Sequence, residues 1–371
     1  MIRNAQNQYN PDSVSPPGET LLETIEALGM SQAELADRTG RSKKTINHII
    51  KGKAPVTPVI ALELESVLGV PASFWNNFEC NYREFLARRK EKENLKKYEE
   101  WLSSIPVRQM IKKGWIKGFK NRVDQIKEAL RFFAIASPDQ WENVSRKYLA
   151  AAYRKSNAFE TDSSALVAWL RKGELDAQKI ECAPYDKDKF GDFLDRKIRT
   201  LTNEPPEVFE SRLIDICAAC GVAVVFVPRL QKMPMNGATR WLTTDKAIIQ
   251  LSLRYKTDDQ LWFSFFHESQ HILRHGKKDV FIEINDLAGH AGKDYWDDPR
   301  EEEANRFAAD LLIPPRQFKA FLERNRFSKR AIREFASQVG ISAGIVVGRL
   351  QYEKVLPYSN CNDLKQKISV G

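Results

Sequence analysis

Helical periodicity dominates the pattern of hydrophobic and polar positions along the chain. From residue 17 to about residue 78, apolar positions recur at helical spacing between short turns. Residues 81–180 continue as helices rich in lysine, arginine and glutamate. The run AVVFVPRL after Gly221 predicts a buried strand, and ATRWLTTDKAIIQLS predicts two strands around a turn near residues 243–246. The pattern therefore predicts a mainly α-helical α+β chain with one small β-sheet.

Changes in composition along the chain suggest five segments. The first residues are polar and rich in proline, serine and asparagine, and the stretch NEPPEVF is typical of a boundary followed by a helix start. We expect a loose arm at 1–16, a small helical domain at 17–80, a basic helical middle region at 81–200, a further domain at 201–357 and a C-terminal tail at 358–371.

Length and composition limit the class of protein. A chain of 371 residues is too long for one ordinary core and suits two or three domains. No apolar run approaches the roughly 20 residues that a membrane span needs, and the N-terminus lacks the apolar segment of a secretion signal. The five cysteines are few, odd in number and scattered, which favours a reducing cytoplasm. We expect a cytoplasmic protein that does not bind a membrane.

The net charge of +9 is unevenly distributed. The formal charges of residues 1–80 sum to −2, those of residues 81–150 to +8 and those of residues 151–371 to +3. The basic stretch is either a solvated helical surface or a face that meets nucleic acid or an acidic partner, and the sequence leaves both interpretations open.

The stretch SFFHESQHILRH, at 264–275, contains candidate metal chemistry. His267 and His271 are four residues apart, so on a helix they share one face and can hold one zinc ion. Glu268 lies one step round the helix, where it can reach a water on the zinc rather than the metal itself. Zinc acidifies such a water, and the carboxylate can take its proton and pass it to a leaving amine. The arrangement predicts zinc-dependent hydrolysis.

The alternative is a surface helix whose histidines bind nothing. The neighbouring positions Trp262, Phe265 and Phe266 make the helix largely apolar, and a capping box from Thr257 to Gln260 marks its start. Such a helix should be buried, and buried imidazoles and carboxylates need partners. The stretch CAAC at 217–220 also invites a metal or redox interpretation, but it has no second CxxC, so a buried helix end is favoured.

A third zinc ligand is expected from EEEANRFAADLLIPP, at 301–315. With FHESQH, this stretch resembles the ImmA/IrrE family of metallo-endopeptidases over residues 205–355. The resemblance implies a zincin-like domain in which Glu301, four residues before Asn305, is the ligand. Helical geometry agrees, because those two positions share a face. Glu302 and Glu303 are then expected to be solvated charges.

Several positions around this motif carry weaker expectations. Gln270 stands where family members commonly have glycine, and its larger side chain could narrow the approach of substrate. His275 is expected either to support the site or to lie at the surface rather than to bind metal, and His290 is expected to be solvent-exposed. A substrate strand is expected to pair along residues 238–242. Candidates for stabilising an oxyanion are Arg240, Arg349 and Tyr352.

A second motif, MSQAELADRTGRSKKTINHIIKG, lies at 30–52. Ser31 can cap a first helix with Glu34, Gly40 makes a turn, and isoleucines anchor a second helix. This helix-turn-helix resembles the Xre/Cro-type repressors, and with PGETLLETIEALGMSQ and ALELESVLGVPASFWNN it resembles the HigA-type antitoxins, over residues 15–80. The resemblance implies a five-helix DNA-binding domain.

In such a unit the second helix enters the major groove. Residues 41–53 contain five positive charges and no negative charge, which suits a phosphate backbone. The candidate DNA-binding residues are Gln32, Arg41, Ser42, Lys43, Lys44, Thr45, Asn47, His48 and Lys51. The alternative is a module that has been retained for dimerisation or protein docking.

Three functions are compatible with these motifs. The first is a DNA-binding regulator, expected to be a homodimer on operator DNA, with a fused zinc endopeptidase that cleaves a repressor or antitoxin partner; the family resemblance places it in stress response, mobile-element or toxin–antitoxin control. The second is an antitoxin-like repressor whose zinc domain is a sensor or a structural module. The third is a peptidase that uses its helix-turn-helix only for docking. Glu268 favours retained catalysis, because a structural zinc site does not need it.

Overall fold

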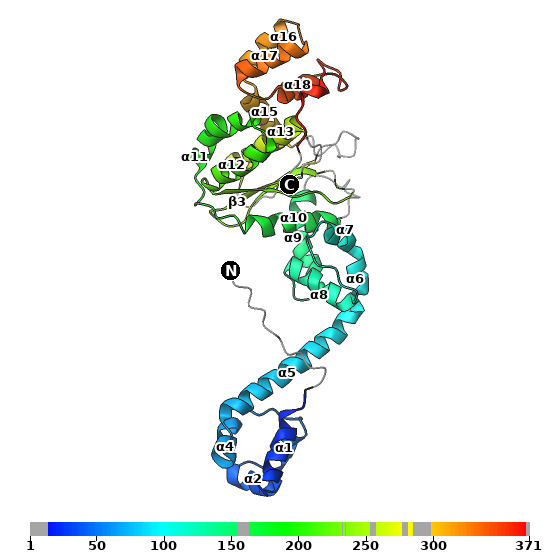
Figure 1. The fold of residues 1–371 in the computed structure, drawn as a ribbon, viewed down its shortest axis with the longest axis vertical. Coiled ribbons are helices and arrows are strands. Elements are labelled where there is room, and N and C mark those ends of the chain that lie inside the picture. The colour runs from blue at the N-terminus through cyan, green and yellow to red at the C-terminus, as the bar shows by residue number, and fades with distance from the viewer. Residues whose placement is uncertain are drawn as a thin grey trace. The chain divides into compact units, whose positions relative to one another are not determined.

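The structure is a computed structural model, and it describes residues 14–153, 163–231, 233, 235–252, 257–276, 281–284 and 298–368. The chain divides into two compact units, Met1–Lys97 and Tyr98–Gly371 (Figure 1). The predicted mainly helical α+β fold with one small sheet is confirmed. None of the described helices is long and apolar enough to cross a membrane.

The described part of the first unit contains five α-helices. They are α1 Pro17–Ala27, α2 Gln32–Thr39, α3 Lys43–Ile50, α4 Pro58–Leu68 and α5 Ala72–Leu95. The predicted cap of α2 is confirmed, because the hydroxyl of Ser31 accepts a hydrogen bond of 3.2 Å from the backbone N–H of Glu34. Gly40 ends that helix with a left-handed φ of 66°, which allows the sharp turn into α3. Leu35, Ile46 and Trp75 are fully buried in the common core.

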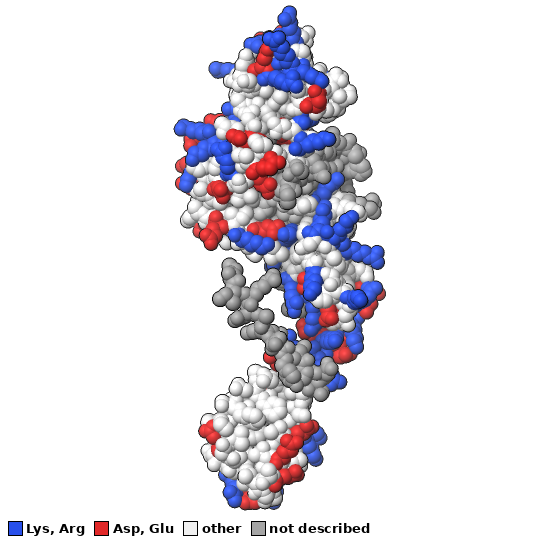
Figure 2. Space-filling model, in the orientation of Figure 1, with Lys and Arg blue, Asp and Glu red and all other residues white. Residues whose placement is uncertain are grey.

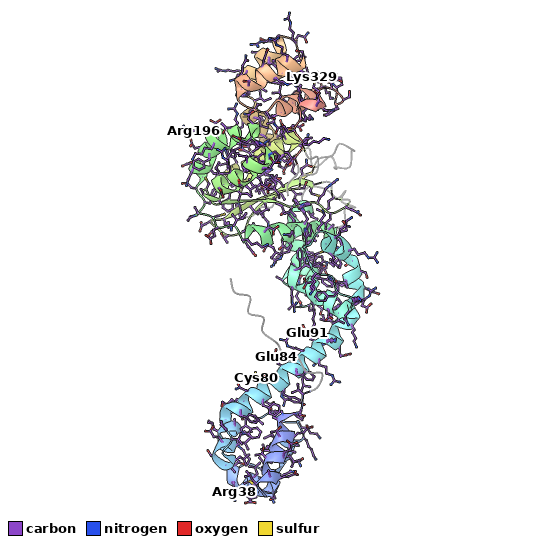
Figure 3. All side chains as sticks on the ribbon, in the orientation of Figure 1. Arg38, Cys80, Glu84, Glu91, Arg196 and Lys329 are labelled. Carbon is purple, nitrogen blue, oxygen red and sulfur yellow. The ribbon has the colours of Figure 1, made fainter. Side chains whose placement is uncertain are left out.

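Helix α5 extends this unit beyond residue 80. Its second half is mostly exposed, and Glu84 and Glu91 project from it in Figure 3. Arg88 forms an ion pair with Glu84 one turn earlier in the helix. Farther along the basic stretch, ion pairs of the same kind join Arg146 to Glu142. Figure 2 shows acidic and basic side chains mixed over this part of the surface, so part of the positive charge is locally compensated.

The second unit packs twelve described α-helices around a four-stranded sheet. The helices are α6 Glu99–Ser104, α7 Val107–Lys112, α8 Arg122–Phe133, α9 Trp141–Tyr153, α10 Ser163–Ala177, α11 Lys187–Phe193, α12 Pro206–Ala218, α13 Asp258–Arg274, α15 Pro299–Leu312, α16 Pro315–Glu323, α17 Lys329–Val339 and α18 Ala343–Tyr352. The strands are β1 Val222–Phe226, β2 Met235–Trp241, β3 Ala247–Leu251 and β4 Phe281–Ile284.

The order of strands in the sheet is β1-β3-β2-β4. β1 runs parallel to β3, while β2 is antiparallel to both β3 and β4. The predicted strand after Gly221 and the predicted β2–β3 hairpin are therefore confirmed. The expectation that a substrate pairs along residues 238–242 is wrong at Ala238 and Thr239, because β4 already pairs with them. Over the described strands, β4 is the edge on that side.

The two faces of the sheet have different partners. The hydroxyl of Thr239 donates to the backbone carbonyl of Glu268, so this position of β2 faces α13. The next residue, Arg240, projects to the other face, where it donates to the backbone carbonyl of Leu170 in α10 and lies over the ring of Tyr148 in α9. Because side chains alternate along a strand, β2 contributes alternate residues to the α13 face.

Helix α13 is buried along most of its length, as its composition predicts. Trp262, Phe265 and Phe266 are each at most 1% exposed, and each contributes about 1.5–3 kcal/mol by leaving water. The predicted capping box at its start is wrong, because Thr257 makes no side-chain cap. The backbone N–H of Asp258 instead donates to the carbonyl of Gln366, so the C-terminal segment completes the start of the helix.

Candidate metal centre

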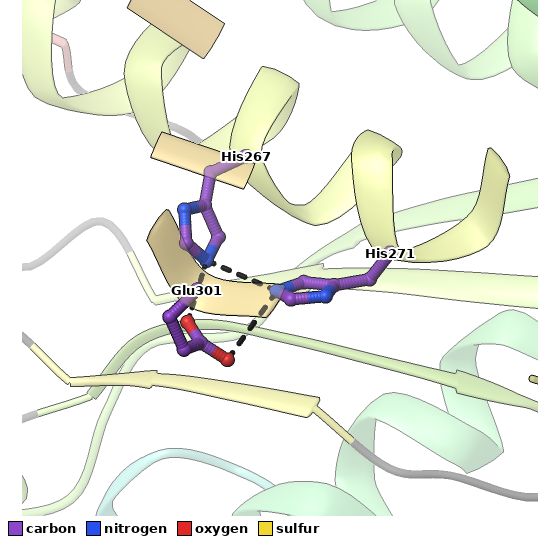
Figure 4. A group of neighbouring side chains, drawn as sticks. All are labelled: His267, His271 and Glu301. Carbon is purple, nitrogen blue, oxygen red and sulfur yellow. Dashed lines mark hydrogen bonds and ion pairs between the residues drawn. The ribbon is translucent and has the colours of Figure 1, made fainter. Parts of the chain in front are cut away.

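Side chains from two helices that are separated in the sequence meet between α13 and α15. His267 and His271 project from one face of α13, and Glu301 reaches them from the first turn of α15 (Figure 4). The Nε2 atom of His267 lies 3.1 Å from Oε2 of Glu301 and 3.1 Å from Nε2 of His271. Nε2 of His271 lies 3.5 Å from Oε1 of Glu301. All three residues are at most 3% exposed.

These separations fit a zinc ion. Zinc binds imidazole nitrogen and carboxylate oxygen at about 2.0–2.2 Å, so neighbouring ligands at the corners of a tetrahedron lie roughly 3.3–3.5 Å apart. The donor atoms of the cluster lie 3.1 to 3.5 Å apart along the contacts just described. Among the residues that the structure describes, this is the group of histidine, cysteine and acidic side chains that could hold a metal.

The outer nitrogen of each imidazole is held by a further side chain. Nδ1 of His267 lies 2.9 Å from Oδ1 of Asn305, and Nδ1 of His271 lies 2.8 Å from Nδ1 of His275. These contacts turn both Nε2 atoms toward Glu301 and fix the orientation of the rings. The structure thus places His275 in a supporting position, and it gives Asn305 a role that its sequence position alone did not reveal.

The charges of the site favour a bound cation. Burial raises the pKa of Glu301, but hydrogen bonds to His267 and His271 outweigh burial and hold that pKa well below its usual range. Burial lowers the pKa of His267, but the hydrogen bond that it donates to Glu301 and the charges of Glu283, Glu301 and Glu268 raise that pKa overall to about 9. The carboxylates therefore attract positive charge, and a divalent ion can replace the protons that the imidazoles would otherwise bind.

Glu268 lies beside the three donor residues but is not one of the candidate metal ligands. It is fully buried, and neither of its carboxylate oxygens has a hydrogen-bond partner in the described part of the chain. Burial, reinforced by the charge of Glu283, raises its pKa to about 8. A buried carboxylate without a partner is costly for folding, so its retention here favours a chemical role.

Gly237 of β2 leaves the space that the Glu268 carboxylate occupies. A Cβ atom at this position would lie 2.8 Å from Oε1 and 2.9 Å from Cγ of Glu268. If Glu268 transfers protons as the sequence predicts, Gly237→Ala should displace its carboxylate, keep zinc content near wild type and reduce the predicted peptide cleavage at least about tenfold, because small displacements of a reacting group are expensive. Metal analysis and a cleavage assay on the same preparation measure both effects.

Gly191→Ala is the matched control. Gly191 also faces α13, but its new Cβ would make only an ordinary contact of 3.9 Å with Leu273 of that helix. It should cleave at the wild-type rate. If the Gly237→Ala protein cleaves as fast as wild type, the Glu268 carboxylate can move away from the added methyl group without loss of function.

Glu303 is an exposed charge, as predicted, with its side chain 50% exposed. It also contacts residues around the site, because its Oε1 accepts a hydrogen bond of 2.8 Å from the side-chain amide of Gln270 and its Oε2 lies 3.6 Å from Nε2 of His275. Gln270 is 4% exposed and joins α13 to α15 through this bond. Glu302 pairs with Arg306 at the surface, as a solvated charge should.

Of the oxyanion candidates, Arg240 is wrong because it projects to the opposite face of the sheet. Arg349 pairs with Glu353 and packs over Phe318, and Tyr352 is 66% exposed. His290 lies outside the described residues. Cys217 and Cys220 are buried at the end of α12, as predicted, and burial raises the pKa of both thiols.

The candidate DNA-binding residues lie on and around α3. Lys43, Lys44 and Lys51 are exposed. Ser42 caps the helix, accepting a hydrogen bond of 3.1 Å from the backbone N–H of Thr45. The remaining candidates have partners within the unit or are half-buried: Arg41 donates two hydrogen bonds to Glu63, the Asn47 amide lies 3.5 Å from the Gln32 carbonyl oxygen, and His48 is half-buried.

Comparison with known proteins gives two separate matches. Residues 220–351 match the peptidase family described as IrrE N-terminal-like domain, and residues 21–75 match the helix-turn-helix family. The uncharacterized HTH-type transcriptional regulator YddM of Escherichia coli K12 is 30% identical over 63 residues, which cover 17% of this chain and 67% of that protein. The chain belongs to the helix-turn-helix transcriptional regulators and carries an IrrE-like domain.

Two solved structures are similar to this regulator. A protein from Nostoc punctiforme, described as an antidote protein of a plasmid maintenance system, is 27% identical, covers 23% of the chain and 92% of its own length, and has a TM-score of 0.22. A HigA-family addiction module antidote protein from Coxiella burnetii is 28% identical, and the match covers 22% of this chain and 91% of that protein, with a TM-score of 0.21. The IrrE-like match contains all three residues of the metal centre.

Two residues of β4 next to the site were not found by sequence reasoning. The ring of Phe281 stacks on His271 with centroids 4.0 Å apart, and Glu283 is a buried acid whose charge affects His267 and Glu268. Neither belongs to a recognisable motif, because their proximity depends on the pairing of β4 with β2.

Proposed function

We propose that this regulator binds operator DNA through its first unit and cleaves a repressor or antitoxin partner with a zinc-dependent endopeptidase in its second unit. The observation that carries the proposal is the buried set of His267, His271 and Glu301 with the unpartnered carboxylate of Glu268 beside it. The three donors would hold zinc. When bound, zinc would act as a Lewis acid that polarises a peptide carbonyl and makes water a stronger nucleophile at neutral pH.

The other steps belong to the chain's own residues. Glu268 would take a proton from the attacking water and deliver it to the amine that leaves. Its burial excludes competing water and keeps its affinity for a proton high. Asn305 and His275 hold the two imidazoles in place through their outer nitrogens, so the site needs little reorganisation during the reaction.

The partner can be identified by trapping. The Glu268→Gln protein, carrying an affinity tag and loaded with zinc, should retain an uncut partner in cells, and purified wild-type protein should then cleave that partner at a defined bond. If trapped partners remain intact after incubation with zinc-loaded wild-type protein, the domain is better explained as the sensor or structural module of an antitoxin-like repressor.

DNA binding is expected to require the exposed lysines at the start of α3. We expect the protein to bind an inverted repeat as a homodimer, with half-sites about one helical turn apart. The double variant Lys43→Ala/Lys44→Ala should weaken specific binding at least about tenfold. Lys51→Ala should weaken binding to all sequences and reduce the slope of affinity against salt by about one unit. Gel-shift titrations at several salt concentrations measure both effects.

Lys319→Ala is the control for this series, because Lys319 is exposed on α16 in the second unit. It should leave the affinity for DNA unchanged. Wild-type affinity in the double variant would mean that α3 is not the recognition helix, and the helix-turn-helix would then be better explained as a docking module.

A further inference from the structure

Strand β4 runs beside helix α13 and directs alternate side chains toward it. Phe281 stacks on His271 at an interplanar angle of 10°. Two residues later, Glu283 pairs with Gly237 of β2, whose Cβ direction points at the Glu268 carboxylate. Residues paired across antiparallel strands share a face, so Glu283 projects toward the same side as Phe281. Glu283 therefore lies beside the catalytic group.

The Glu283 carboxylate is buried and incompletely satisfied. The residue is 7% exposed, and its Oε1 receives one long hydrogen bond of 3.4 Å from the side-chain amide of Asn236. Its Oε2 has no hydrogen-bond partner within the described ranges. Burial raises the pKa of Glu283, and the charge of His267 and the side chains of Ser264 and Asn236 oppose that rise without cancelling it. Such a group gains most from a cationic partner.

Glu283 is distinct from the groups already assigned at the site. It is neither one of the three proposed zinc ligands nor the proposed base Glu268, and its Oε2 is a buried oxygen without a hydrogen-bond partner among the described residues. A cationic group of a bound molecule would supply that partner.

We propose that Glu283 binds a cationic group of the substrate next to the scissile bond, either a basic side chain or a free α-ammonium. The inference rests on the proposed peptidase function and defines its substrate class. Among the described strands β4 is the sheet edge, and helix α9 lies on the face opposite α13, as the stacking of Arg240 over Tyr148 indicates. A peptide extended along β4 would place alternate side chains on the Glu283 face.

Four hydroxamates test the proposal, because each can anchor on zinc and they carry the two candidate cationic groups in every combination. L-Norleucine hydroxamate has an α-ammonium, N-acetyl-L-lysine hydroxamate has a basic side chain, L-lysine hydroxamate has both, and N-acetyl-L-norleucine hydroxamate has neither. Their dissociation constants are measured by calorimetry on the zinc-loaded full chain. At least one single-charge probe should bind about tenfold or more tightly than the uncharged probe, and the one that does identifies the source of the cation.

Glu283→Gln should abolish this preference and leave the affinity for the uncharged probe within about twofold of wild type. Glu334→Gln, which removes a surface carboxylate paired with Arg330, should keep the preference. Zinc content and thermal unfolding confirm that the variants are loaded and folded.

Three results would overturn the inference. Equal binding of all four probes, or a charge preference that persists in Glu283→Gln, would exclude a cation-binding role for Glu283. Loss of zinc from Glu283→Gln would make this residue part of the metal site instead. Failure of the proposed function looks different: a zinc-loaded protein that binds hydroxamates with the predicted preference but cuts no partner retains the subsite and lacks the peptidase. Absence of binding by every probe would overturn the metal site on which both ideas rest.

Discussion

Glu301→Gln and His271→Ala are each expected to lower zinc affinity roughly a thousandfold or more and to abolish cleavage. Catalytic zinc is normally held by three protein ligands, and two ligands rarely retain it. The wild-type chain should contain about one zinc, because His267, His271 and Glu301 form a single cluster in the described residues. Zinc content after dialysis, and competition with a chromogenic chelator, measure the loss.

Glu302→Gln provides the matched control. It neutralises the next acid in the chain, whose side chain is 73% exposed and paired with Arg306, whereas the Glu301 side chain is 5% exposed and lies 3.1 Å from His267. The control should keep its zinc. Equal zinc loss in both variants would point to a general effect on α15, and full zinc content in Glu301→Gln would remove Glu301 from the ligand set.

The clustering of the three candidate metal ligands could be predicted from the sequence because helical periodicity fixes most of it locally. His267 and His271 share a face wherever α13 lies, and the ExxAN match placed Glu301 on the same face of α15 as Asn305. Only the meeting of the two helices had to be supplied by tertiary structure. The burial of the site also followed from sequence, since Trp262 and its aromatic neighbours leave α13 little exposed surface.

Features that depend on strand order could not be predicted in the same way. Alternation along β2 separates Thr239 from Arg240, but it does not say which of the two faces α13. For that reason Arg240 was a candidate for the site, although it binds α10 on the other face. The position of β4 outside β2 likewise follows from pairing across more than forty residues of sequence, so the edge strand and Glu283 became visible only in the fold.

Distant segments also replaced local interactions that the sequence favoured. Thr257 and Gln260 have the spacing of a capping box. In the structure, however, Thr257 forms an isolated β-bridge with Lys367, and the backbone N–H of Asp258 donates to the carbonyl of Gln366. Glu303 is exposed, as predicted, and also accepts a hydrogen bond from the side-chain amide of Gln270 in α13. In both places a polar group has a tertiary partner about which local spacing gives no information.

Glu268→Gln is expected to keep zinc and DNA binding while lowering cleavage by a factor on the order of a hundred or more. Glutamine has nearly the same shape and fits the space opposite Gly237, so the fold and the metal ligands should be undisturbed. The amide cannot take a proton from water, however, and the described residues place no other unpartnered carboxylate except Glu283 beside His267. Cleavage must be compared on a substrate that the wild-type protein demonstrably cuts.

The double variant Glu268→Gln/Glu283→Gln separates the two carboxylates. If Glu268 is the base and Glu283 only binds substrate charge, Glu283→Gln alone should mainly raise KM, and the Glu268→Gln background should lose kcat whether or not Glu283 is present. If Glu283 can act as the base instead, Glu268→Gln alone will retain substantial kcat and only the double variant will be inactive. Near-wild-type kcat in the double variant would remove both carboxylates from proton transfer and leave the metal centre without a base.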